Sequence, residues 1–253
     1  FLGLGPPLDE SGPAFDVEEL ELPGNTPENR EEKKRGSGID SLLRLLVSTA
    51  HAEESASVSL TDVKEWIPPA RDFGPYLDRV KEVLEQAAME AFSKSQLEAS
   101  YQALHRNLIL ATAWQESCWR QFVRSQGKAR YLVSYNQTSV GLMQINERVW
   151  RGLYRLESLR WNIRYNVRAG CEILNLYLKD YAMKKTESKI PLGPDTLVRV
   201  TYAMYNAGPR EYHAFLKRNE KNVLYARDRL FWQKYSLSKE GQFDGLSVCL
   251  GGE

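Results

Sequence analysis

Cysteine and histidine, the usual ligands of structural zinc, are scarce in this sequence. Its 253 residues include three cysteines, Cys118, Cys171 and Cys249, and three histidines. No two cysteines form the CxxC spacing that is typical of structural zinc sites. We therefore expect no metal and no cofactor. For the cysteines, two interpretations stay open: one disulfide with one remaining thiol, or three separate buried thiols.

Long apolar runs are missing as well. No stretch reaches the roughly 20 apolar residues that a transmembrane helix needs, so we expect no membrane-spanning segment in this chain. Residues 33–54, "KKRGSGIDSLLRLLVSTAHAEE", have the small-residue ending of a signal peptide. We do not interpret them as one, because Asp40 and Arg44 interrupt the apolar part.

A strong overall charge is also absent. The net charge is +1, which gives no reason to expect nucleic acid as a partner. The charge is nevertheless uneven, since residues 1–60 carry 12 acidic and 5 basic side chains and the remainder carries 21 acidic and 29 basic ones. Two interpretations fit: an acidic arm that binds a protein partner and a basic body that favours an anionic polymer, or two differently solvated surfaces.

Strand-like alternation of apolar and polar residues is rare, and a small hairpin within residues 129–141 is the one exception. Apolar residues recur instead at spacings of three and four, most clearly over 74–92, which predicts an amphipathic helix. A second long helix is predicted over about 94–122. Further helices are predicted near 147–154, 164–183, 195–206, 209–218 and 221–234. The predicted fold class is therefore all-α, or mostly so.

Three regions follow from composition. Residues 1–60 are predicted to be an acidic extended arm or linker with a short helix at 39–50. Residues 61–235 form the predicted main domain. Residues 236–253 are polar and glycine-rich and are predicted to be a C-terminal tail.

One carboxylate stands on an apolar helix face. In "ATAWQESCWRQFV", residues 111–123, Glu116 shares a face with Ile109 and Ala113. Burying an unpaired carboxylate is costly. Glu116 is therefore either a structural acid paired with an arginine such as Arg120, or an acid whose raised pKa lets it donate a proton near neutrality.

Two further motifs favour the second interpretation. In "SVGLMQINERVW", residues 139–150, Gly141 permits a close backbone approach to a ligand, and Gln144 is a polar residue among apolar ones. In "TYAMYNAGP", residues 201–209, Tyr205 and Asn206 end a helix before Ala-Gly-Pro. Each motif alone is common in ordinary helical proteins.

Taken together and in this order, the motifs resemble the lytic transglycosylases of the soluble type, the SLT domain, with its lysozyme-like fold. The resemblance lies in Glu116-Ser117, Gly141 to Ile145, Tyr205 to Pro209, and the helix "NVRAGCEILNLYL" with Asn166 and Gly170. It covers about residues 95–235. One departure is the stretch "RQFVRSQGKARYLVSYNQTSV", residues 120–140, which is longer than the family's loop.

The resemblance implies cleavage of the MurNAc-β-1,4-GlcNAc bond of peptidoglycan glycan strands. Glu116 would protonate the glycosidic oxygen and then accept a proton from the sugar's C6 hydroxyl, giving a 1,6-anhydroMurNAc end without metal or water. Tyr205 would bind Glu116 or the acetamido group, and Asn206 would brace Tyr205. The sugar contacts would come from Gln144 and the backbone of Met143, with Ser117 fixing the site.

Structural roles remain open for several of these residues: a solvated helix position for Ser117, core packing for Met143 and a C-cap for Asn206. Trp114, Trp119 and Trp150 would either stack on sugars or fill the core. The resemblance leaves open a Cys118–Cys171 bridge or two separate thiols.

Three competing functions follow from the same residues. They are a lysozyme-type muramidase, a non-catalytic glycan-binding or assembly module, and, with less support, a hydrolase using Cys118 as nucleophile. Because peptidoglycan lies outside the cytoplasm, the resemblance also implies an exported protein of the periplasm or cell envelope.

Overall fold

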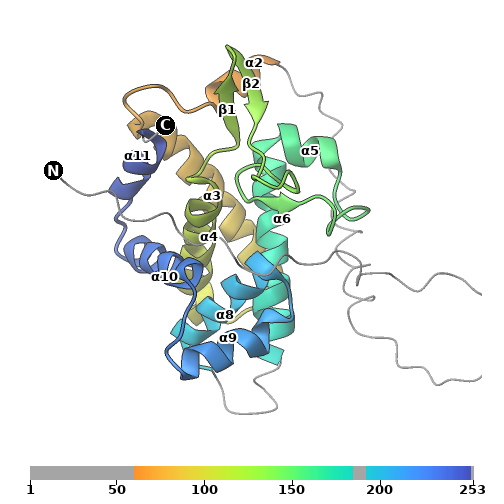
Figure 1. The fold of residues 1–253 in the computed structure, drawn as a ribbon, viewed down its shortest axis with the longest axis vertical. Helices are drawn as coiled ribbons and strands as arrows, with labels where there is room; N and C mark the ends of the chain where they lie inside the picture. Colours follow the sequence, from red (N-terminus) through yellow and green to blue (C-terminus); the bar gives the residue numbers. More distant parts are fainter. Residues whose placement is uncertain (1–59, 185–191, 252–253) are drawn as a thin grey trace, which may run out of the picture. The chain divides into compact units, whose positions relative to one another are not determined.

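A computed structural model describes residues 60–184 and 192–251, all within the unit Ile39–Glu253. The predicted acidic arm, apart from Leu60, and its short helix at 39–50 lie outside these residues. The described part is mostly α-helical, as the sequence predicts (Figure 1). None of the helices in it combines the length and apolar character needed to cross a bilayer.

The helices and helical turns carry most of the described chain. They are α2 (Leu60–Glu65), α3 (Gly74–Ser95), η2 (Ala99–Tyr101), α4 (Gln102–Ser117), α5 (Leu156–Trp161), α6 (Ile163–Asn175), the π-helical η3 (Leu176–Met183), α8 (Pro194–Ala207), α9 (Glu211–Glu220), α10 (Ala226–Lys239) and α11 (Asp244–Gly251).

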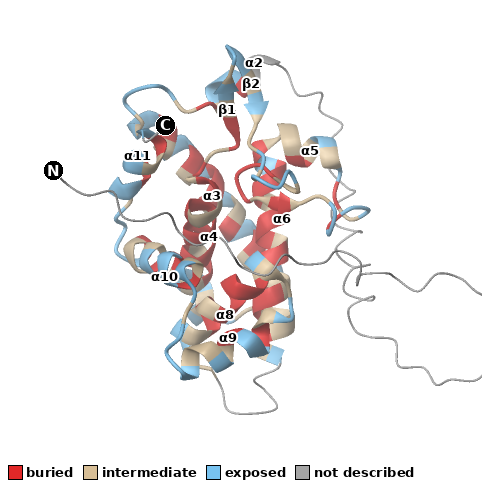
Figure 2. Cartoon of the chain, viewed as in Figure 1, coloured by how far each residue is buried: buried red, intermediate tan, exposed pale blue. Residues whose placement is uncertain are grey.

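Helix α4 is the one around which its neighbours pack. It contacts α3, α6, α8 and α10, and its residues from Leu108 to Trp114 are buried without interruption. A helix that is apolar on all sides is stable only inside a core. Figure 2 shows the buried residues concentrated along α4, α6 and α8.

Helix α3 follows the predicted amphipathic pattern, with Tyr76, Val80, Leu84 and Ala88 among its buried residues. The prediction of one helix over 94–122 is wrong at both ends. Helix α3 continues to Ser95 and stops where Gln96 adopts a left-handed conformation, with φ of 58°. Helix α4 covers only Gln102–Ser117.

The small β structure comprises two antiparallel hairpins. Strands β1 (Phe122–Ser125) and β2 (Lys128–Tyr131) pair around Gln126 and Gly127. Both turn residues have positive φ, as a tight primed hairpin turn requires. Strands β3 (Ser139–Val140) and β4 (Ile145–Asn146) pair around residues 141–144. The prediction of one hairpin within 129–141 is therefore wrong, because this range holds most of β2 and all of β3, which belong to two different hairpins.

The remaining helix predictions differ in accuracy. Those near 164–183, 195–206, 209–218 and 221–234 correspond to α6 with η3, α8, α9 and α10. The helix predicted near 147–154 is wrong, because residues 147–150 form turns and Arg151 bridges to Tyr154. Gly152, with φ of +83°, makes this reversal possible.

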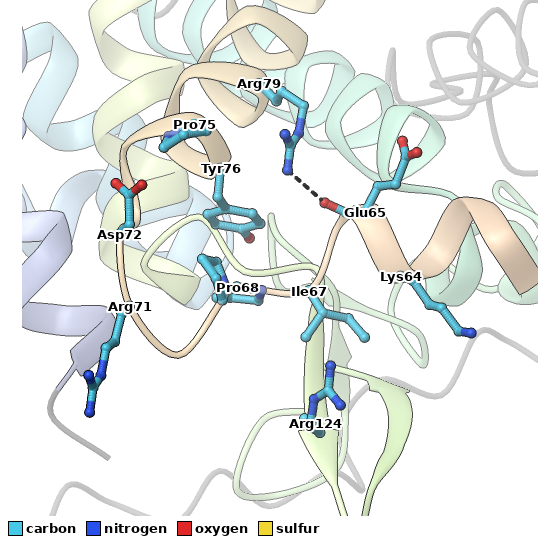
Figure 3. A pocket seen from close by; sticks show the side chains of 11 residues that line it. Lys64, Glu65, Ile67, Pro68, Arg71, Asp72, Pro75, Tyr76, Arg79 and Arg124 are labelled. Carbon is cyan, nitrogen blue, oxygen red and sulfur yellow. Dashed lines mark hydrogen bonds between the residues drawn. The ribbon is translucent and has the colours of Figure 1, made fainter.

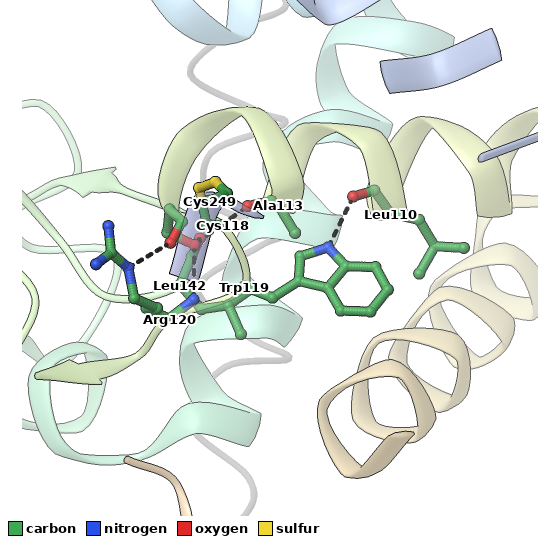
Figure 4. Close-up of a disulfide and its surroundings, with 8 residues drawn as sticks. Leu110, Ala113, Cys118, Trp119, Arg120, Leu142 and Cys249 are labelled. Carbon is green, nitrogen blue, oxygen red and sulfur yellow. Dashed lines mark hydrogen bonds between the residues drawn. A yellow bond between two sulfur atoms is a disulfide. The ribbon is translucent and has the colours of Figure 1, made fainter. Parts of the chain in front are cut away.

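The segment predicted as a tail, 236–253, instead completes α10 and forms α11. Leu246 and Leu250, one turn apart, are buried. Cys249 of α11 forms a disulfide with Cys118, with Cα atoms 6.1 Å apart (Figure 4). Cys171 is a free, buried thiol. The Cys118–Cys171 bridge considered from the sequence is therefore wrong.

The disulfide closes a long loop, since its cysteines lie 131 residues apart. A bridge of this span restricts the unfolded chain, and its loss typically costs about 3 kcal/mol. We expect the Cys118→Ser/Cys249→Ser double variant to lose about that much free energy of unfolding in urea titrations. A reductant should destabilise the wild type and leave the double variant unchanged, and an unchanged wild type would contradict the pairing.

Candidate active site

Glu116 lies in the last turn of α4, where the buried core reaches the surface. Ile109 and Ala113, on the same face, are fully buried, and Glu116 is partly buried. The hydroxyl of Tyr202, from α8, donates a hydrogen bond of 3.0 Å to Oε1 of Glu116. The carboxyl therefore sits at a junction between two core helices.

Burial raises the pKa of the Glu116 carboxyl from 4.5 to about 7. Hydrogen bonds from Tyr202 and Asn206 and the positive charge of Lys234 lower this pKa, but they do not offset the lost hydration. A large share of Glu116 is therefore protonated at neutral pH. Such an acid can donate a proton under physiological conditions.

Tyr202 is held by an aromatic stack. Its ring lies parallel to that of Phe231 in α10, with centroids 3.9 Å apart and an interplanar angle of 4°. Both side chains are fully buried. Burial raises the pKa of Tyr202 well above 10, and the charge of Glu116 raises it further. Tyr202 therefore keeps its proton and remains a hydrogen-bond donor to Glu116.

Lys234 contributes the nearby positive charge. Its Nζ lies 5.9 Å from the ring centroid of Trp114, two residues before Glu116. Burial lowers the pKa of Lys234, and the charge of Glu116 counteracts this. The partly buried ammonium thus interacts electrostatically with the carboxylate form of Glu116.

The loop of the β3–β4 hairpin, residues 141–144, is joined to the end of α4 at Leu142. The hydroxyl of Ser117 donates to the Leu142 carbonyl at 2.6 Å and to that of Ala113 at 3.1 Å. The Leu142 N–H donates to Oε1 of Gln121 at 2.8 Å. Ser117 and Gln121 are both buried. Together they fix the loop relative to Glu116.

The next residue, Met143, is joined to two other helices. Its N–H donates to Oδ1 of Asn166 in α6 at 2.8 Å, and its carbonyl accepts from the hydroxyl of Tyr205 in α8 at 2.6 Å. The Met143 side chain is fully buried and packs so closely on Gly170 that a Cβ there would lie 2.5 Å from Met143 Cγ. The Met143 side chain is therefore part of the core, and the Met143 backbone is part of the candidate active site.

The structure brings the predicted site residues together, but Tyr205 and Asn206 form hydrogen bonds that differ from the expected ones. Tyr205, expected at Glu116 or the substrate, hydrogen-bonds Met143, and the bond to Glu116 comes from Tyr202 instead. Asn206 hydrogen-bonds Glu116 rather than bracing Tyr205. Gln144 donates to the carbonyl of Gly141 at 2.8 Å and is partly exposed.

Sequence reasoning missed the aromatic and charged support of Glu116. Tyr202, Tyr205 and Asn206 are spaced by three and four residues, so they share one face of α8. This spacing indicates, from the sequence alone, that Tyr202 lies on the same helix face as the other two candidate site residues. Phe231 and Lys234 lie in α10, and their role depends on tertiary packing that no local pattern shows.

Burial and bonding also decide the roles of three tryptophans and of Cys118. Trp114, Trp119 and Trp150 are at most 9% exposed, so they are core residues and not sugar platforms. The disulfide of Cys118 removes the thiolate that a cysteine nucleophile needs. Within residues 60–184 and 192–251, no group of three His, Cys, Asp or Glu side chains is arranged to hold a metal.

Gly141 has no room for a side chain. It has φ of +75°, and a Cβ would overlap the amide groups of Asn166 and Gln121. Gly127 has nearly the same φ, +74°, but open space around it. We expect Gly127→Ala to cost about 1 kcal/mol of unfolding free energy from backbone strain, and Gly141→Ala about 3 kcal/mol because overpacking adds to it. Equal losses in urea unfolding would show that the Gly141 loop is not packed as described.

Comparison with known proteins adds the family. The model of the transglycosylase SLT domain matches residues 94–225, a range that includes Glu116, the 141–144 loop and Tyr205. Neither the curated proteins nor the solved structures gave a match. The domain has a lysozyme-like fold and supports a glycan-cleaving enzyme of the lytic transglycosylase type with peptidoglycan as substrate. Because the match spans more than half of the 253 residues, the chain belongs to the transglycosylase SLT domain family.

Proposed function

We propose that this protein is a peptidoglycan lytic transglycosylase that cleaves the MurNAc-β-1,4-GlcNAc bond without water and leaves 1,6-anhydroMurNAc ends. In this proposal Glu116 is the single catalytic acid and base. The proposed substrate-binding site around it consists of Ser117, Tyr205, Asn206, Gln144 and the backbone of Met143.

The observation that carries the proposal is the burial of the Glu116 carboxyl near the end of α4, which raises its pKa. Its pKa of about 7 supplies the proton that the leaving glycosidic oxygen needs. A solvated glutamate, with a pKa near 4.5, would be almost fully ionised at neutral pH. Desolvation by the surrounding core thus fits the first half of the reaction.

The absence of a partner carboxylate favours a substrate-assisted route. Glycosidases with two carboxylates place the second about 5–5.5 Å or 6.5–9.5 Å from the first. Among the described residues, the charged group that acts on the pKa of Glu116 is Lys234, and no carboxylate acts on it. Glu147, the acid nearest to the 141–144 loop in sequence, is engaged by Arg160 at 2.7 and 2.8 Å.

The second half of the reaction uses the ionised form of Glu116. After the proton moves to the glycosidic oxygen and the C1–O bond breaks, the acetamido group of the sugar stabilises the cationic C1. The C6 hydroxyl then attacks C1 and gives its proton to Glu116. Tyr202, Asn206 and Lys234 all favour the carboxylate, so they stabilise Glu116 between the two proton transfers.

We also propose that the protein is exported to the periplasm or cell envelope. Its substrate lies there, and the Cys118–Cys249 disulfide is typical of an oxidising compartment. Cell fractionation with an alkylation assay of the two cysteines tests this: reduced cysteines in the native protein would argue for the cytoplasm.

The first test is a digest of purified sacculi with the wild type and Glu116→Gln. We expect the wild type to release products one water lighter than those of a muramidase. We expect Glu116→Gln to lower the rate by about a thousandfold, because a neutral amide cannot transfer the proton. Hydrated products would establish the lysozyme-type hydrolase, and equal release by the two proteins would favour the non-catalytic glycan-binding module.

The second test concerns Lys234. Activity should fall as the pH rises through the pKa of Glu116, because the acid must be protonated at the start. The charge of Lys234 lowers that pKa, so Lys234→Met should raise it and move the alkaline limb of the kcat/KM profile to higher pH. Lys239→Met is the control, since Lys239 is an exposed residue of the same helix. An unchanged limb in Lys234→Met, or the same shift in both variants, would contradict this role.

A further inference from the structure

A surface hollow is lined by residues other than those that surround Glu116. It has a volume of about 460 Å³ and is bounded by α2, the loop that follows it, the start of α3 and strand β1 (Figure 3). This volume lies within the range of small-ligand sites, roughly 300–1,000 Å³. We call it the α2–α3 pocket.

Most of the α2–α3 pocket is built from residues that precede the part of the chain matched by the family model. Its lining residues from Lys64 to Arg79 precede the SLT match, which begins at residue 94. Its remaining lining residue, Arg124, lies in the stretch 120–140 that is longer than the family's loop. The pocket is therefore distinct from the glycan site around Glu116.

Cations outnumber acids around this pocket. The charged lining residues are four cations and two acids: Lys64, Arg71, Arg79, Arg124, Glu65 and Asp72. Among the described residues, no carboxylate forms an ion pair with these four cations, although Glu65 and Asp72 line the same pocket. Unpaired guanidinium groups are well suited to bind carboxylates, with two parallel hydrogen bonds each.

The arrangement is partly rigid and its floor is apolar. Ile67 and Tyr76 are buried, and Pro68 restricts the loop between them. Nη2 of Arg79 donates to the Glu65 carbonyl at 3.1 Å, which positions that side chain. Figure 3 shows Arg79 and Arg124 on opposite sides of the Tyr76 ring. The pocket thus combines an apolar floor with two arginines that face a common space.

The pocket floor is bonded directly to the segment that follows the catalytic acid. The Tyr76 hydroxyl donates to the carbonyl of Trp119 at 2.7 Å. Trp119 lies three residues after Glu116 and has a left-handed backbone, with φ of 60°. The pocket residue Tyr76 is therefore joined by a hydrogen bond to the chain segment that directly follows α4.

We propose that the α2–α3 pocket binds a carboxylate of the acidic peptide stems that peptidoglycan carries on its glycan strands. This inference rests on the proposed function, because it takes peptidoglycan as the substrate. A strand seated at Glu116 carries its peptide stems beside it, and a pocket with unpaired cations and an apolar floor suits a peptide with a free carboxylate. The enzyme would then favour strands that bear peptides over denuded strands.

The binding test does not depend on cleavage. A soluble stem peptide is titrated into the folded Glu116→Gln protein, followed by NMR or calorimetry. We expect binding that weakens about tenfold when Arg79→Gln and Arg124→Gln are added and weakens further in high salt. Arg130→Gln is the matched control, since Arg130 is exposed in the same hairpin and does not line the pocket. Absence of binding, or equal binding by all variants, would overturn the proposal.

The kinetic test uses the active enzyme with peptide-bearing and amidase-denuded glycan strands. We expect Arg79→Gln/Arg124→Gln to raise KM about tenfold for peptide-bearing strands, with kcat and the denuded strands unaffected. An equal rise in KM on both substrates would overturn the proposal. Binding of an unrelated acidic peptide as tightly as the stem peptide would also overturn it, because the pocket would then be assigned to a protein segment. If neither type of strand is cleaved, the proposed function fails. The binding titration still shows whether the α2–α3 pocket binds the stem peptide.

Discussion

The chemistry of this protein depends on the desolvation of one carboxyl group. Glu116 lies in the last turn of α4, after the buried run from Leu108 to Trp114, so its ionised form loses hydration that its neighbours only partly replace. The hydroxyl of Tyr202 donates a hydrogen bond to Glu116, and this bond keeps the pKa of Glu116 from rising further. In the proposed mechanism, this balance lets Glu116 act first as an acid and then, once it has given up its proton, as a stabilised base.

A second feature is the 141–144 loop, which is fixed by hydrogen bonds to α4, the segment that follows it, α6 and α8. The backbone of Leu142 and Met143 is held by side chains from α4, the segment after it, α6 and α8, and each of these bonds is between 2.6 and 2.8 Å. Buried backbone groups must be paired, and here the pairing also orients the loop. Helix α10 and helix α11 lie beyond the SLT match, yet they supply the ring under Tyr202, the charge of Lys234 and the disulfide at Cys118.

The sequence predicts those parts that local chemistry controls. The apolar spacing of α3 and α8 predicts the right elements, and the glutamate predicted on an apolar helix face shares that face with the buried Ile109 and Ala113. The end of α4 could not be predicted, because Cys118 and Trp119 adopt left-handed conformations that their side chains do not favour and that tertiary bonds impose. The partner of Glu116 and the partner of Cys118 likewise depend on which helices meet in space.

The most direct test is an NMR titration of the Glu116 side-chain carboxyl in the folded wild-type protein, with Glu116→Gln used to assign the resonance. Desolvation against the core predicts a midpoint of about 7. A midpoint near 4.5, the value of a solvated glutamate, would contradict the account, because no protonated acid would then be ready at neutral pH.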